Sequence, residues 1–355
     1  MKQTITKRIT RSILATILPA VISCLTALPG ISSSMQARGK APESHYRETR
    51  SRRSAHRKLT VRKVPRAMVK ASFFDDTTIV YASGNSVFLA SILDGGPELE
   101  FKGHTGLIQD YKVEPGRKRI VTSSEDGTLR LWDSRTGECL AVSEQLDTLS
   151  QPGWTMLLEI VYHPNGRTLM TSDMEGMKVW DASDLKLLSV ENSDLFYMAY
   201  GLISSDWKTV SCPVPETYND CAVYERGTED VLLYAEGRAP VCYSRDGKRL
   251  LAASYDTGAM EIWDVNPSNK TGRQTLVWLK SEGFPLKDAA FSPDGRRLVS
   301  AHEGGFIRIW ETRDGAEKET LQWDGMDIDG VCFDSRGVRI LAIDNDAREF
   351  SIWGP

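Results

Sequence analysis

The chain has 355 residues, of which 41% are hydrophobic and 8% aromatic, so it can build a globular core and is not a disordered protein. Residues 1–70 contain 16 Lys and Arg against only Glu43 and Glu48, whereas residues 71–355 contain 28 Lys and Arg against 46 Asp and Glu. A basic N-terminal segment therefore precedes an acidic body.

Residues 1–37 have the pattern of a targeting segment. Four Lys or Arg residues among the first 11 are followed by residues 12–37, which carry no charge and contain a short apolar run. This order is typical of a signal peptide, with an uncleaved membrane anchor as the alternative. Cys24 ends a run that resembles a bacterial lipobox, which would make it a lipidation site. We therefore predict an exported protein: periplasmic, in the cell envelope or secreted.

Residues 38–57 form a basic stretch that is poor in aliphatic side chains, which predicts a disordered linker. Its charge would suit nucleic acid or an anionic membrane. Nucleic acid is the less favoured partner, because an exported protein meets little of it. A spacer between the membrane and the body is the simpler interpretation.

From residue 58 onward the sequence repeats itself, which decides the predicted fold class. The segment 103–140 contains Gly-His, a Pro-Gly turn, a β-rich run, an Asp-Gly turn and Trp-Asp. Four further copies place a tryptophan at the same point, at Trp180, Trp263, Trp310 and Trp353. Each copy alternates apolar and polar residues between Asn, Asp or Gly turns, as antiparallel strands do.

Two weaker copies complete the set, with Ala90 and Tyr224 at the place of the tryptophan. The seven landmarks are separated by 42, 48, 44, 39, 47 and 43 residues. This spacing matches a propeller repeat of about 40–45 residues. We therefore predict an all-β, seven-bladed β-propeller over residues 58–355.

These repeats resemble those of the WD-repeat (β-transducin-like) propeller family. The resemblance implies a structural hydrogen-bonded tetrad, whose places are taken here by His104, Thr122, Asp126 and Trp132. A hydroxyl, a histidine and an acid also suggest a catalytic triad, but triads are recognised by geometry, and the order here is that of the tetrad. The resemblance implies a fold and leaves the function open, because this fold has many functions.

The other repeats depart from the tetrad. Met170, Ala253 and Ile343 stand where the hydroxyl residue is expected, and no second Gly-His is present. We therefore predict that most blades are held together by packing instead of by this network.

The last repeat ends on its third strand, at Trp353, and residues 58–64 alternate like a strand. In the family, an N-terminal strand commonly completes the last blade, which leaves no open sheet edge. The sequence thus predicts that residues 58–64 pair with the strand that contains Phe350, Ile352 and Trp353.

The chemistry-bearing residue types form no catalytic or metal-binding pattern. The histidines are scattered, and neither a Cys-x-x-Cys motif nor a phosphate-binding glycine loop occurs. We expect no catalytic residue, no cofactor and no metal. Cys212 and Cys221 flank a predicted hairpin, and a disulfide between them is left open.

The turns between second and third strands are rich in acid, with Glu125, Glu175, Asp256 and Glu303 as the candidate partner-binding residues. In a propeller these turns share one face, and a ring of like charge favours a basic protein or peptide. Asp is also common in turns for backbone reasons, so a purely structural interpretation stays open.

The links between blades reach the same face and contain aromatic residues, which are over-represented at binding hot spots. The candidate anchors are Trp154, Phe196, Tyr197, Phe284 and Trp323.

Together these patterns predict a monomeric, non-catalytic protein-interaction scaffold, exported or tethered to a membrane. Two alternatives stay open: a cytosolic or nuclear scaffold whose basic arm binds nucleic acid, and a propeller enzyme with an unrecognised site in its channel.

Overall fold

The computed structural model describes residues 56–65, 68–93, 96–144, 159–173, 176–191, 202–213, 220–228, 231–254, 258–265, 275–279, 284–323 and 328–355. The chain divides into two units, Met1–Ser51 and Arg52–Pro355, and the described residues belong to the second. The predicted targeting segment with Cys24, and all but the last two residues of the predicted linker, lie outside the described residues.

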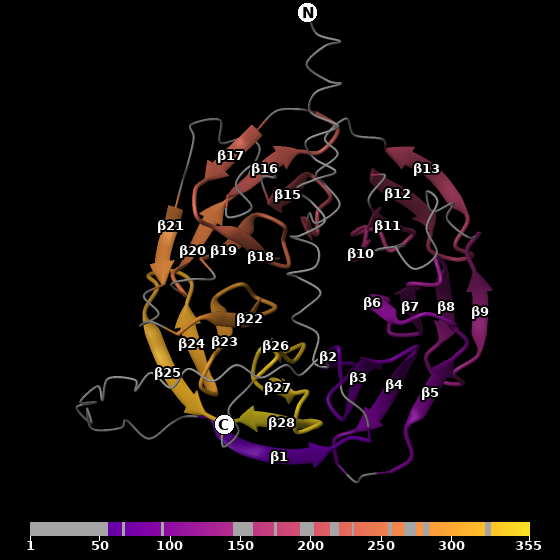
Figure 1. The fold of residues 1–355 in the computed structure, drawn as a ribbon, viewed down its shortest axis with the longest axis horizontal. Helices are drawn as coiled ribbons and strands as arrows, with labels where there is room; N and C mark the ends of the chain where they lie inside the picture. The colour runs from indigo at the N-terminus through magenta and orange to yellow at the C-terminus, as the bar shows by residue number, and fades with distance from the viewer. Residues whose placement is uncertain are drawn as a thin grey trace, which may run out of the picture. The chain divides into compact units, whose positions relative to one another are not determined.

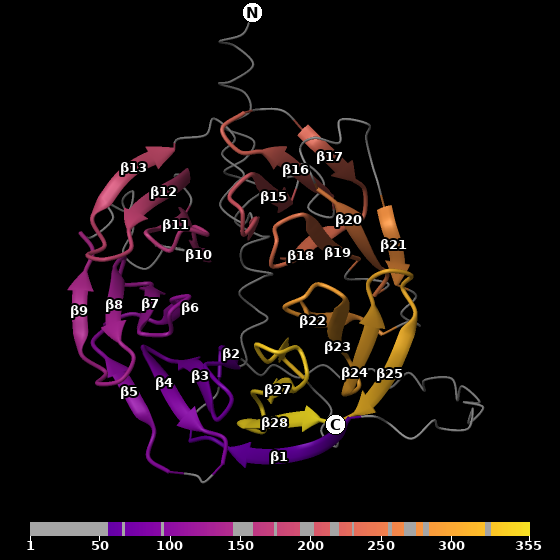
Figure 2. The ribbon, with the colours of Figure 1, turned by 180° about the vertical axis from the view of Figure 1, so that it is seen from behind.

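The second unit consists of seven four-stranded antiparallel sheets, the blades, arranged in a ring (Figures 1 and 2). The predicted all-β, seven-bladed propeller is confirmed. The innermost strands of blades 1 to 7 are β2 (Lys70–Phe73), β6 (Ile108–Val113), β10 (Glu159–Tyr162), β14 (Leu202–Ile203), β18 (Ala239–Tyr243), β22 (Leu286–Phe291) and β26 (Gly330–Phe333).

The second strands are β3 (Thr78–Ser83), β7 (Arg119–Ser124), β11 (Thr168–Asp173), β15 (Thr209–Pro213), β19 (Arg249–Ala253), β23 (Arg297–His302) and β27 (Ile340–Asp344). The third strands are β4 (Ser86–Ser91), β8 (Leu129–Asp133), β12 (Gly176–Asp181), β16 (Cys221–Glu225), β20 (Met260–Asp264), β24 (Phe306–Glu311) and β28 (Glu349–Gly354). The outer strands are β5 (Leu99–Lys102), β9 (Cys139–Val142), β13 (Leu187–Glu191), β17 (Val231–Ala235), β21 (Thr275–Leu279), β25 (Glu317–Gln322) and β1 (Arg57–Lys63).

The last blade is closed by the N-terminal strand, as predicted. β1 is the outer strand of blade 7 and runs antiparallel to β28, with Lys58 opposite Trp353 and Arg62 opposite Phe350. Because β1 precedes blade 1 in the chain and completes blade 7 in space, it joins the first and last blades of the ring.

Second and third strands are buried along nearly their whole length, because each lies inside a blade that has a neighbour on both faces. Their apolar residues therefore run almost continuously. In blade 7, the outer strand β1 alternates exposed and half-buried residues. The core consists of apolar layers between neighbouring blades, as where Trp132 packs on Val80 and Val87 of blade 1.

Ala90 replaces the tryptophan in blade 1, and larger residues nearby fill the space. The rings of Tyr81 and Phe88 stack with centroids 5.1 Å apart. Both rings, together with the fully buried Met68, pack on Phe350 and other residues of blade 7. The layer that seals the first blade against the last is thus complete without an indole.

Candidate functional site

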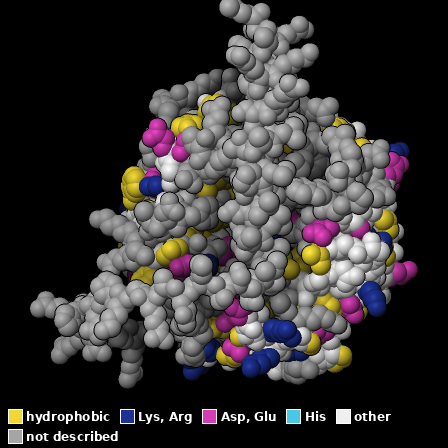
Figure 3. Space-filling model, viewed as in Figure 1, with side chains coloured by type: hydrophobic (Ala, Val, Ile, Leu, Met, Phe, Trp, Pro, Cys, Tyr) yellow, Lys and Arg dark blue, Asp and Glu magenta, His cyan; other side chains and the backbone are white. Residues whose placement is uncertain are grey.

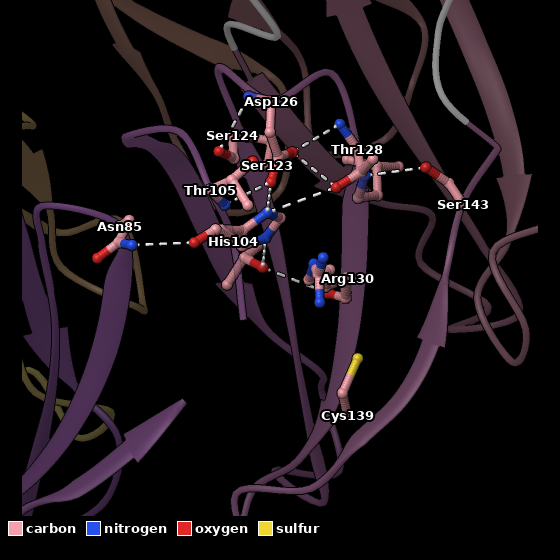
Figure 4. A network of polar contacts seen from close by, with 12 residues as sticks. Asn85, His104, Thr105, Ser123, Ser124, Asp126, Thr128, Arg130, Cys139 and Ser143 are labelled. Carbon is pink, nitrogen blue, oxygen red and sulfur yellow. Dashed lines mark hydrogen bonds and ion pairs between the residues drawn. The ribbon is translucent and has the colours of Figure 1, made fainter. Parts of the chain in front are cut away.

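The four predicted tetrad residues lie together in blade 2, where Figure 4 shows His104 beside Asp126. Nδ1 of His104 is 2.8 Å from the carboxylate of Asp126, and Nε2 is 2.7 Å from the hydroxyl of Thr122. The indole N–H of Trp132 donates to the same hydroxyl at 2.9 Å. His104, Thr122 and Trp132 are almost fully buried, so the hydroxyl is enclosed by the blade and closed to a substrate.

The electrostatics of this network favour a neutral histidine beside an ionised carboxylate. Burial lowers the pKa of His104 and outweighs the opposing effect of Asp126. Burial opposes ionisation of Asp126, but hydrogen bonds from Thr128, the N–H of Thr105 and His104 lower its pKa to about 2. With His104 neutral, Nδ1 donates to Asp126 and Nε2 accepts from Thr122, so all three side chains are satisfied.

Parts of this network also occur in blades 3 and 6, and the predicted hydroxyl position of blade 3 is wrong by one residue. In blade 3 the acceptor is Thr171, not Met170, and it takes the indole N–H of Trp180 at 2.9 Å. In blade 6, Ser300 accepts the N–H of Trp310 at 2.8 Å and contacts Nε2 of His302, also at 2.8 Å.

In blades 5 and 7, the acceptor of the tryptophan N–H is a residue of the third strand. The residues equivalent to Thr122 of blade 2 are Ala252 in blade 5 and Ala342 in blade 7. Each lies one residue before the position predicted from the sequence, Ala253 or Ile343. In their place, Ser351 accepts the N–H of Trp353 at 2.7 Å.

In blade 5 the acceptor is a buried carboxylate. Glu261 takes the N–H of Trp263 at 3.0 Å and pairs with Nε of Arg238 at 2.8 Å. Arg238 lies in the link that enters blade 5 and also stacks on Trp278 of the outer strand, 5.7 Å from the ring centroid. This Arg–Glu–Trp chain connects the link, β20 and β21.

The structure describes two of the four candidate acidic residues in the turns between second and third strands. Glu125 and Glu303 are exposed, in the turns after β7 and β23. Glu303 lies 3.5 Å from the ammonium of Lys287. Glu175 and Asp256 lie outside the described residues. On the face drawn in Figure 3, acidic side chains are spread around the ring, with Lys and Arg side chains at its lower edge, where β1 lies in Figure 1.

Two of the five candidate anchors are described, and their environments differ. Phe284 is 38% exposed and packs on Phe306, with ring centroids 4.9 Å apart. Trp323 is only 3% exposed, in the layer between blades 6 and 7 with the ammonium of Lys58 5.0 Å from its ring. The interpretation of Trp323 as a binding anchor is therefore wrong: it is a core residue. Trp154, Phe196 and Tyr197 lie outside the described residues.

With this geometry in view, the chain can be compared with known proteins. The family model "WD domain, G-beta repeat" matches residues 95–133 and 279–311, which include the strands that carry Trp132 and Trp310. The β-propeller domain of Cps50 (Swd1) from Myceliophteria thermophila superimposes with a TM-score of 0.67, over 84% of this chain and 99% of that one, at 13% identity.

In sequence and fold the chain is similar to WD-repeat propellers. Its curated relatives include the Denticleless protein homolog of Gallus gallus, 26% identical over 52% of this chain and 24% of the relative. Another is the Target of rapamycin complex subunit wat1 of Schizosaccharomyces pombe, 27% identical over 61% of this chain and 55% of the relative. The chain thus spans between about a quarter and about half of these relatives.

A set of inner-strand side chains in this WD-repeat propeller was missed in the sequence. Asp110 accepts the N–H of Ile160 in the next blade at 2.9 Å and pairs with the ammonium of Lys70. Burial opposes ionisation of Asp110, but the charges of Lys70 and Lys112 and the hydrogen bonds that the carboxylate accepts together outweigh it and lower the pKa. The carboxylate thereby joins three consecutive blades.

Glu159 and Asp288 repeat this arrangement in two other blades. Glu159 accepts the N–H of Ile203 at 2.9 Å, and Asp288 accepts that of Val331 at 2.8 Å. Burial raises the pKa of both carboxyls, that of Asp288 to about 6. The signal in the sequence is their place, five residues before the proline of a strand turn, as it is for Asp110.

Cys212 and Cys221 are buried and free, and burial raises the pKa of both thiols. No group of His, Cys, Asp and Glu among the described residues could hold a metal ion. In the same part of the chain, no helix is long and apolar enough to span a membrane.

Proposed function

We propose that this protein is a non-catalytic scaffold, exported or membrane-tethered and monomeric, which binds a basic segment of a protein partner. The binding face is the one that carries the turns between second and third strands. WD-repeat propellers are in general protein-interaction scaffolds, and one relative is by its name a complex subunit. We assign the hydroxyl, histidine and acid of blade 2 a structural role. The hydroxyl of Thr122 is buried and already accepts the indole N–H of Trp132.

One observation carries the binding proposal: exposed carboxylates and an exposed ring share this face. In an antiparallel sheet, the second-to-third turns and the links to the next first strand emerge on the same side. Glu125, Glu303 and Phe284 therefore face the same partner. Exposed carboxylates attract a cationic segment and speed its encounter, and the ring supplies apolar area.

The test is binding of a fluorescent oligo-lysine peptide to the full chain. We expect Glu125→Gln, Glu175→Gln, Asp256→Asn and Glu303→Gln together to weaken binding roughly tenfold and to flatten its salt dependence. Asp126 stays unchanged, because its role in the tetrad would mix stability with binding. The control carries Glu138→Gln, Asp184→Asn, Asp314→Asn and Glu317→Gln, exposed acids of the opposite face with the same total charge.

The proposed face is rejected if both quadruple variants bind the peptide like the wild type, or if both lose binding equally. The second result would show that only net charge matters. Export has a test of its own: sequencing the N-terminus of the native protein. We expect a chain shortened by roughly 23–37 residues, whereas an intact Met1 on cytosolic protein would contradict export.

A further inference from the structure

The opposite face of the propeller carries exposed cations near the channel. Turns between first and second strands emerge there, and they lie close to the axis because they leave the innermost strands (Figure 1). In blades 2, 3, 5 and 6 these turns expose six cations, which we call the basic arc: Arg117, Lys118, Arg167, Arg245, Lys248 and Arg296.

Turns of neighbouring blades touch one another on this face, so the charges of the basic arc belong to one surface. A Cβ on Gly247 of blade 5 would lie 2.9 Å from the backbone of Asp206 in blade 4. The turn of blade 7 also packs on that of blade 6, with 3.2 Å between a Cβ on Gly337 and the ring of Pro293. The arc ends at blade 7, where Asp76 of blade 1 pairs with Arg336 and Arg339.

The carboxylates in the same turns accept hydrogen bonds from residues of their own turn. Asp246 accepts the hydroxyl of Ser244 at 2.6 Å, and Asp294 accepts that of Ser292 at 2.6 Å. Both also accept a backbone N–H. None of the six cations of the basic arc forms an ion pair with a described residue, so their charge faces solvent.

Arg117 occupies a backbone conformation that suits glycine. Its φ is 56°, and the equivalent turn positions in blades 3, 5, 6 and 7 hold glycines with φ between 67° and 72°. A side chain is disfavoured in this left-handed region, and that of Arg117 is exposed to solvent. Because the backbone conformation at Arg117 disfavours a side chain, the presence of arginine there indicates a function for its charge.

We propose that the basic arc binds an acidic segment of a protein partner, on the face opposite the proposed basic-partner site. On this face, the turns between third and fourth strands of blades 2, 3 and 6 expose Glu138, Asp184 and Asp314, and Glu317 is exposed at the start of β25. A broad anionic surface such as a membrane would meet these acids as well as the cations, whereas a narrow acidic segment meets the cations alone.

A single-stranded nucleic acid fits this surface less well than an acidic peptide. Such ligands are held by aromatic rings that stack on bases together with cations. The aromatic residue of these turns in blade 4, Trp207, is only 7% exposed and packs edge-on against His163, 4.7 Å between centroids.

The test measures binding of a fluorescent oligo-glutamate peptide to the full chain by anisotropy. We expect Lys118→Gln, Arg167→Gln, Lys248→Gln and Arg296→Gln together to weaken binding roughly tenfold. The control neutralises four exposed cations elsewhere, Lys102, Arg135, Lys186 and Lys318, and should change affinity less than about twofold.

A second variant, Arg117→Gly, separates binding from folding. It relieves the backbone and removes one cation, so we expect an equal or higher melting temperature together with binding weakened about twofold. A binding loss with a stable fold cannot come from unfolding.

Three results would overturn the proposal: both quadruple variants lose peptide binding equally, neither loses it, or Arg117→Gly binds the peptide like the wild type. Anionic vesicles and a single-stranded oligonucleotide are measured alongside. Tighter binding of either one, lost in the arc variant, would assign the surface to that ligand instead of an acidic peptide. The oligo-lysine experiment reports on the other face, so the two proposals can fail separately.

Discussion

A buried indole N–H costs free energy unless it meets an acceptor, and five blades of this propeller supply one each. The acceptor is a second-strand hydroxyl in three blades. In the other two it is a third-strand residue, Glu261 or Ser351. The tryptophan is thus the common element of these blades, and its partner varies.

Trp132→Ala should lower the free energy of unfolding by about 3–5 kcal/mol, because it leaves a cavity and removes the donor to Thr122. Trp132 is 1% exposed. The matched control is Trp278→Ala, since Trp278 is 52% exposed, and its effect should stay below about 1 kcal/mol. Urea unfolding of both variants measures this. Equal stability of Trp132→Ala and the wild type would show that the indole is not part of a structural network.

The buried His302 should make the free energy of unfolding depend on pH in the acid range. Burial lowers its pKa from 6.5 to about 4. The unfolded chain then binds a proton more readily than the folded one, so this stability is present above pH 6.5 and is lost as the pH falls towards 4. Between pH 7 and pH 5 the wild type should lose about 2 kcal/mol more than His302→Gln.

Urea unfolding at the two pH values gives this difference directly. The comparison with His302→Gln cancels Asp288, whose raised pKa acts in the opposite direction. An equal loss in both proteins would contradict a buried neutral imidazole.

The tetrad of blade 2 could be placed from the sequence, and its count of ten residues before the tryptophan also gives Ser300 in blade 6, but it does not give the hydroxyl of blade 3. In blade 2 the hydroxyl of Thr122 lies ten residues before the tryptophan, and in blade 3 that of Thr171 lies nine before. The same count of ten gives Met170, whose side chain points to the opposite face, because side chains alternate along a strand. Turn length sets the register, and single-sequence patterns do not fix it.

At the scale of the element, arginines at the start of second strands connect neighbouring blades. Arg249, Arg297 and Arg339 lie over Phe291, Phe333 and Phe73 of the following blade, 5.8, 5.5 and 5.1 Å from the ring centroids. Each aromatic ring ends the first strand of its blade. The contact therefore joins two blades at the turns of one face.

Arg297→Ala should destabilise the protein by about 1–2 kcal/mol, because it removes the stacking on Phe333 and the hydrogen bond to the carbonyl of Gly337. The neighbouring Arg296 is exposed, and Arg296→Ala should change stability by less than about 0.5 kcal/mol. Thermal or urea unfolding distinguishes the two. Equal effects would show that Arg297 is an ordinary surface residue.

The strands and their order followed from the sequence because alternation and turn residues are local signals. The arginine contacts and the carboxylates of inner strands did not, since both connect blades that are distant in the chain. Arg339 and Phe73 are an example, in blades 7 and 1. Burial of Trp323 was missed for the same reason: its ring packs in the layer between blades 6 and 7, with Lys58 of β1 beside it.

At the scale of the whole molecule, β1 completes blade 7, the blade against which blade 1 packs. β1 covers the edge of β28 and places Lys58 within 5.3 Å of the Trp353 ring. An uncovered β28 would expose unpaired backbone groups, which promote aggregation. Closure also supplies contacts on which a repeat array depends for cooperative folding.

Thermal unfolding of two truncated chains tests this closure most directly. Deletion of residues 1–54 keeps β1 and should leave a monomer that melts like the full chain. Deletion of residues 1–66 removes β1, so we expect the melting temperature to fall by at least about 5 °C, with aggregation. If the longer deletion melts within about 2 °C of the shorter one and stays monomeric, closure by the N-terminal strand is contradicted.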